Sequence, residues 1–83
     1  MSRRRPELSI AMLTSAVQAI ESDPAASTRH WSDVLAATEA RLAAGVFPSA
    51  RWRERAERER EIALSKLARI AAGERVTTSF EEA

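Results

Sequence analysis

The sequence predicts an all-α fold, either a three-helix bundle or a helical hairpin with a short N-terminal helix, followed by an extended C-terminal tail. Alanine, leucine, arginine and glutamate dominate the composition, and all four are strong helix formers. Apolar residues recur at three- and four-residue steps, as one face of a helix requires. Only two glycines and three prolines are present, and four of these five mark helix boundaries. We therefore divide the chain into a basic arm (residues 1–6), a helical domain (7–73) and a tail (74–83).

The first helix is predicted over residues 7–21. Pro6 suits a position just before or inside a first helical turn, and Pro24 disfavours helical geometry at the residue that precedes it. One side of this helix is apolar, and its main side chains are Ile10, Leu13, Val17 and Ile20. The sequence leaves open whether this stripe packs on its own chain or on a neighbouring copy.

The second helix has two candidate starts. Asp23 can cap a helix that has Pro24 in its first turn, and Ser27 can cap a later start. The helix is expected to end at Ala44, because Gly45 follows where a left-handed C-terminal cap would sit. The side chains expected to face the core are Trp31, Val34, Leu35, Thr38 and Leu42.

A third helix is predicted from the N-cap Ser49 to about Ala72, with Gly73 as its stop. Its apolar stripe consists of Trp52, Ala56, Ala63, Leu67 and Ile70. A second stripe, named here the basic ridge, consists of Arg51, Arg55, Arg58, Lys66 and Arg69. An acidic ridge beside it consists of Glu54, Glu57 and Glu61. The apolar stripe is thin in its middle, so the core of one chain is expected to be small, with Trp52 as one of its members.

The tail has a different character from the helices. Residues 76–80 are β-branched, aromatic or small and polar, which is typical of a short strand or an extended arm. A chain end of this kind more often frays when nothing covers it. Phe80, which precedes the acids Glu81 and Glu82, is interpreted as an exposed anchor for a partner.

Composition argues against catalysis and against bound cofactors. The chain has no cysteine, and its single histidine, His30, cannot supply a metal site alone. Adjacent residues of the segment from His30 to Asp33 point in different directions on a helix, so they do not converge as a catalytic triad requires. No glycine-rich phosphate loop is present, and no apolar stretch approaches the ~20 residues of a membrane span. We expect a soluble, cytoplasmic protein that is no enzyme and takes no metal, cofactor or small-molecule substrate.

The predicted function is that of a helical protein–protein interaction module. A chain of 83 residues buries only about two-thirds of the surface that it exposes when unfolded, and small domains commonly gain stability by self-association. The module is therefore expected to form a homo-oligomer and to bind an unidentified protein, as an adaptor, an assembly subunit or an inhibitor. The predicted contact residues are Trp52, Leu67, Ile70, Val76 and Phe80.

The alternative is a small DNA-associated protein, such as a regulator, an antitoxin or a DNA-packaging accessory subunit. Its phosphate contacts would come from the arm and the basic ridge, namely Arg3, Arg4, Arg5, Arg51, Arg55, Arg58, Lys66 and Arg69. A net charge of +1 is low for a dedicated nucleic-acid binder, and the acidic ridge would repel a duplex lying across the helix. Salt bridges within or between copies are the stronger interpretation of the ridge.

Overall fold

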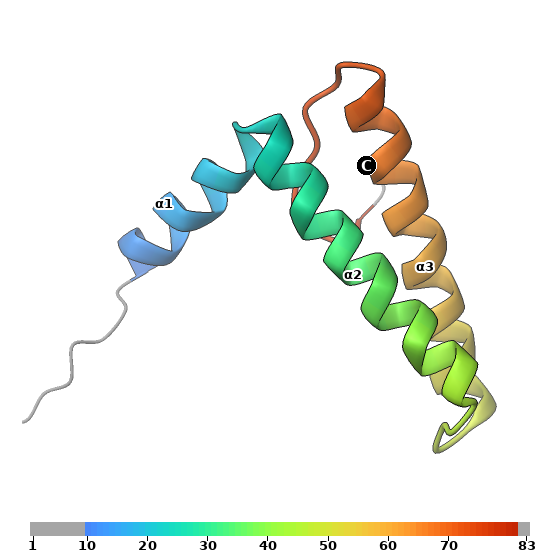
Figure 1. The fold of residues 1–83 in the computed structure, drawn as a ribbon. Coiled ribbons are helices and arrows are strands. Elements are labelled where there is room, and N and C mark those ends of the chain that lie inside the picture. The colour runs from blue at the N-terminus through green and yellow to red at the C-terminus, as the bar shows by residue number, and fades with distance from the viewer. Residues whose placement is uncertain (1–9, 82–83) are drawn as a thin grey trace, which may run out of the picture.

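The computed structural model describes residues 10–81, and within this range the chain forms three helices and no strand. The helices are α1 (Ile10–Glu21), α2 (Pro24–Ala44) and α3 (Ala50–Ala71). Helices α2 and α3 lie side by side as a hairpin, α1 projects away from it at an angle, and the tail folds back toward it (Figure 1). This arrangement confirms the predicted all-α fold. The basic arm and the predicted helical residues 7–9 lie outside the described residues.

The chain ends α1 and begins α2 within a few residues. The backbone N–H of Ser22 still donates to the carbonyl of Gln18, at 2.9 Å. Asp23 then caps α2, because its carboxylate accepts a hydrogen bond from the backbone N–H of Ala25 at 3.1 Å, and Pro24 occupies the first turn. Of the two predicted starts of α2, the earlier one is therefore correct.

The turn of the hairpin uses the predicted residues. Gly45 has a φ of 69°, in the left-handed region, and its N–H donates to the carbonyl of Arg41 at 3.1 Å. Ser49 is the N-cap of α3 and has extended backbone geometry. Its carbonyl accepts from the N–H of Trp52 at 3.1 Å, which starts the helical hydrogen-bond pattern. At the other end α3 stops at Ala71, close to the predicted position.

The hydrophobic core lies between α2, α3 and the tail. Its buried members are Trp31 from α2, Ile62 and Ala63 from α3, and Val76 from the tail. The partly buried side chains that pack around it are Val34, Leu35, Leu67 and Ile70. Val76 of the tail is only 3% exposed and belongs to the core, so the described part of the tail packs on the helices, a point that the sequence had left open.

Two side chains of α3 differ in exposure from the prediction: one expected to be buried is exposed, and one expected to be exposed is buried. Trp52 was expected in the core but is 47% exposed, because it lies in the first turn of α3, at the end of the hairpin where α2 stops at Ala44. Lys66 was expected on the exposed basic ridge but is only 2% exposed. Its neighbours three and four residues away, Ala63 and Ile70, face the core, and the lysine faces it with them.

Candidate interaction surfaces

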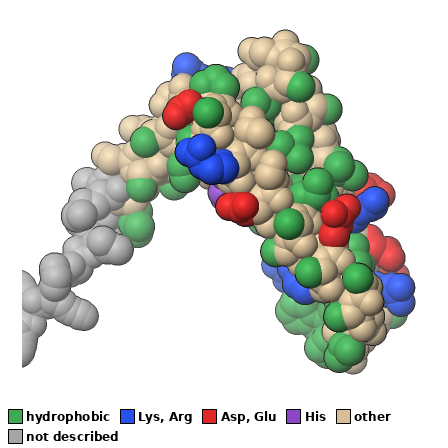
Figure 2. All heavy atoms as spheres, in the orientation of Figure 1, with side chains coloured by type: hydrophobic (Ala, Val, Ile, Leu, Met, Phe, Trp, Pro, Cys, Tyr) green, Lys and Arg blue, Asp and Glu red, His purple; other side chains and the backbone are tan. Residues whose placement is uncertain are grey.

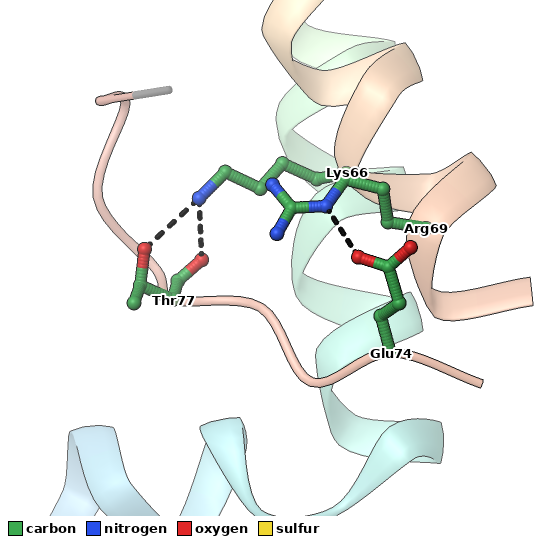
Figure 3. Close-up of polar contacts among 4 residues, drawn as sticks. All are labelled: Lys66, Arg69, Glu74 and Thr77. Atoms are coloured by element: carbon green, nitrogen blue, oxygen red, sulfur yellow. Dashed lines mark hydrogen bonds and ion pairs between the residues drawn. The ribbon is translucent and has the colours of Figure 1, made fainter. Parts of the chain in front are cut away.

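The tail is attached to the helices through two charged side chains. Lys66 of α3 donates from its Nζ to the backbone carbonyl of Thr77 at 3.1 Å and to the Thr77 hydroxyl at 2.9 Å (Figure 3). Glu21, the last residue of α1, accepts from the backbone N–H of Thr78 at 2.7 Å and from its hydroxyl at 3.2 Å. The tail therefore joins the ends of α1 and α3, which are far apart in the sequence.

Aromatic packing completes this attachment. The ring of Phe80 meets that of Trp31 edge-on, with centroids 5.3 Å apart and an interplanar angle of 88°. The Nζ of Lys66 lies 5.3 Å from the centroid of the Trp31 ring, within range of a cation–π interaction. Trp31 thus packs against the lysine that anchors the tail and against the last aromatic residue of the tail.

These contacts remove several predicted residues from the free surface. Lys66 bonds to the tail inside the protein, and Arg69 pairs with Glu74 at 2.9 Å (Figure 3). The predicted phosphate contact by Lys66 is therefore wrong, since the side chain is buried. Leu67 and Ile70 are partly buried against the core and Val76 is buried in it, so the predicted protein contacts of these three side chains stay a prediction with little exposed surface behind it. Arg3, Arg4 and Arg5 lie outside the described residues.

The remaining predicted residues meet on one surface of α3. Trp52 and Phe80, both exposed by more than two-fifths, line a groove of about 720 Å³. The other residues that line it are Arg51, Glu54, Arg55, Arg58, Glu59 and Ile62. The guanidinium of Arg55 lies 5.4 Å from the Trp52 ring centroid. The structure thus joins two aromatic residues with three arginines that the sequence analysis assigned to a different function.

The charged residues of this part of α3 fall into two groups. The first group forms ion pairs within the chain, at 3.3 to 3.6 Å. These pairs are Arg53–Glu57, Arg55–Glu59, Arg41–Glu59 and Arg60–Glu39. The second group is exposed and makes no ion pair with any residue from 10 to 81, and it consists of Arg51, Glu54, Arg58 and Glu61. We name these four residues the unpaired stripe.

Helix α1 presents a second surface, and it is apolar. Among the helices α1 packs against α2 alone, and Leu13 and Val17 remain 52% and 39% exposed. No charged residue occurs in α1 before Glu21. In the view of Figure 2, hydrophobic side chains lie along α1, whereas side chains of both charges gather toward the α2–α3 turn. The two surfaces therefore differ in chemistry.

Comparison of the chain with protein families, with curated proteins and with solved structures finds no match. Within residues 10–81, no helix combines the length and the apolar character that a membrane crossing requires. The same part of the chain contains no group of three or more histidine, aspartate or glutamate side chains placed to hold a metal ion.

Sequence reasoning missed the attachment of the tail. A signal was present at Lys66, because Ile62, Ala63 and Ile70 surround it at helical spacing and indicate an inward-facing position. Its acceptor, Thr77, is eleven residues away, and only the folded chain brings the two together. The bond between Glu21 and Thr78 has no local sequence signal, because it joins residues 57 positions apart.

Proposed function

We propose that this protein is a non-enzymatic helical interaction module that associates with copies of itself. The observation that carries the proposal is the apolar stripe of α1. Leu13 and Val17 are exposed in the single chain, and α3 lies too far from α1 to cover them. Exposed apolar surface on a helix is typical of a binding face, because its removal from water gains roughly 25 cal/mol for each Å² buried.

The small core supports the same proposal. Its fully buried hydrophobic side chains include one large aromatic residue, Trp31, and two alanines, Ala56 and Ala63. The alanines let α2 and α3 approach closely but bury little apolar surface themselves. A domain of this size gains stability when it buries more apolar surface, and association with a second copy buries such surface without a longer chain.

The groove on α3 supports a role as an adaptor, an assembly subunit or an inhibitor with a further protein partner. Tryptophan, phenylalanine and arginine are enriched in protein interfaces, and Trp52, Phe80 and Arg55 are brought together there. The alternative of a DNA-associated protein stays a prediction. Its support is reduced, because Lys66 is buried and Arg69 pairs with Glu74.

The test is a comparison of two variants of α1 by light scattering behind a sizing column. Val17→Glu places a charge in the exposed apolar stripe, and Gln18→Glu places the same charge on the neighbouring, exposed residue. We expect the wild-type chain and the Gln18→Glu variant to have the mass of more than one chain. We expect Val17→Glu to shift toward the mass of one chain. A wild-type protein that stays monomeric at high concentration would refute the proposal.

A further inference from the structure

The charges at the start of α3 would match opposite charges on a second copy of the same helix that runs antiparallel to it. When the sequence from Arg51 to Glu61 is read outward from Ala56 in both directions, each charge meets an opposite charge at the same distance. These matched positions are Arg51 with Glu61, Arg53 with Glu59, Glu54 with Arg58, and Arg55 with Glu57. The one position that does not match is Arg60, because the residue at the same distance on the other side of Ala56 is the uncharged Trp52.

The unpaired stripe is the part of this pattern that remains available to a partner. Its members lie at steps of three, four and three residues, so they cover only about 80° of the helix circumference. The stripe is centred on the side of α3 roughly opposite Ala56, which is fully buried. All four side chains are exposed, whereas the other five charged residues from Arg53 to Arg60 already form ion pairs within the chain.

We propose that two copies of this chain pair antiparallel through α3, with a two-fold axis at the level of Ala56. In this arrangement Arg51 of each copy faces Glu61 of the other, and Glu54 faces Arg58. A two-fold interface repeats every contact, so two distinct pairs give four intermolecular ion pairs. The inference rests on the proposed self-association. It adds α3 as a second contact between copies, beside the apolar stripe of α1, and gives the orientation of that contact.

The charge order also disfavours other arrangements. A parallel pairing in register would place each residue of the unpaired stripe opposite its own copy, so every contact would join like charges. An antiparallel pairing that slips by three residues would place Arg51 opposite Arg58, or Glu54 opposite Glu61. Exposed ion pairs contribute little affinity each, so we assign the stripe the role of fixing orientation and register.

The experiment uses two charge-reversal variants of the full chain, measured separately and mixed, by sedimentation equilibrium at low salt. Arg58→Glu leaves only acids at positions 54 and 58, and Glu54→Arg leaves only arginines there. Each variant alone should self-associate about tenfold more weakly than the wild type, because like charges meet twice across the interface. An equimolar mixture should recover nearly the wild-type association constant, because opposite charges meet again in the mixed dimer.

Arg53→Glu is the matched control. It introduces the same charge change and the same like-charge spacing to Glu57 within the helix, but it lies off the unpaired stripe. We expect it to associate like the wild type, and circular dichroism should show equal helicity in all variants. If the wild type associates but mixing restores nothing, the antiparallel pairing is wrong and the proposed function stands. If the wild type does not associate, both the antiparallel pairing and the proposed self-association are refuted.

Discussion

Lys66 of α3 and Thr77 of the tail are joined by two hydrogen bonds, at 3.1 Å to the carbonyl and at 2.9 Å to the hydroxyl of Thr77. A lysine that is only 2% exposed has lost its water, so these acceptors replace part of its hydration. The relationship makes residues 74–81 of the tail part of the fold, and it ties the position of α3 to that of the tail.

Thr77→Val tests this relationship directly. The substitution keeps the size and β-branching of the side chain but removes one acceptor of a buried ammonium group. We expect the free energy of unfolding to fall by about 1–3 kcal/mol, measured by urea denaturation. Thr28→Val, at an exposed position of α2, is the control and should change it by less than about 0.5 kcal/mol. Equal stability of the two variants would show that the bond contributes nothing.

Two valines of very different exposure test the place of the tail in the core. Val76 is 3% exposed and Val46, in the hairpin turn, is 84% exposed. Val76→Ala should lower the free energy of unfolding by about 2 kcal/mol, because it leaves a cavity beside Trp31. Val46→Ala should change it by less than about 0.5 kcal/mol. Thermal or chemical denaturation of the two variants side by side gives the comparison, and a harmless Val76→Ala would contradict the packed tail.

The contact between Phe80 and Trp31 should be visible in tryptophan fluorescence. A Trp52→Phe background leaves Trp31 as the single tryptophan. In that background Phe80→Ala should shift the Trp31 emission to longer wavelength, because the part of the indole that Phe80 covers becomes exposed to water. The phenylalanine is itself 42% exposed, so the expected loss of stability is only about 0.5–1.5 kcal/mol. An unchanged spectrum would mean that Phe80 does not cover the indole in solution.

Gly45 should be sensitive to substitution for a backbone reason. Its φ of 69° lies in the left-handed region, and an added Cβ would meet no atom within 4 Å outside Gly45 and its two chain neighbours. Gly45→Ala should therefore cost about 1–2 kcal/mol through backbone strain alone. Gly45→Asn should cost less, because asparagine tolerates this conformation better than alanine does. Denaturation midpoints of the two variants test this order of stability. A Gly45→Ala protein that is more stable than the Gly45→Asn protein would contradict it.

The boundaries of the fold could be read from the sequence because local chemistry sets them. Asp23 with Pro24 starts α2, Gly45 ends it and Ser49 starts α3, each through a backbone geometry that these residue types favour. The inward side of α2 was predicted for the same reason, since Trp31 and Thr38 follow helical spacing and are buried.

The candidate surfaces could be predicted only in part. The sequence identified Trp52, Phe80 and the arginines of α3, but it could not show that they line one groove, because Phe80 reaches it through the fold of the tail. Lys66 was assigned to the exposed ridge because of its charge, although its helical neighbours face inward, and the acceptors that allow its burial come from the tail. Contacts between segments that are distant in sequence decide both the lining of the groove and the burial of Lys66, and helical spacing contains no information about such contacts.

Sedimentation equilibrium of the wild-type protein over a wide range of concentration measures directly whether the chain associates with itself. We expect a mass that rises from that of one chain toward that of two or more chains as the concentration increases. We also expect weaker association at high salt, because charges fix the pairing of α3. A mass of one chain at every concentration and every salt level would show that the protein does not associate with itself.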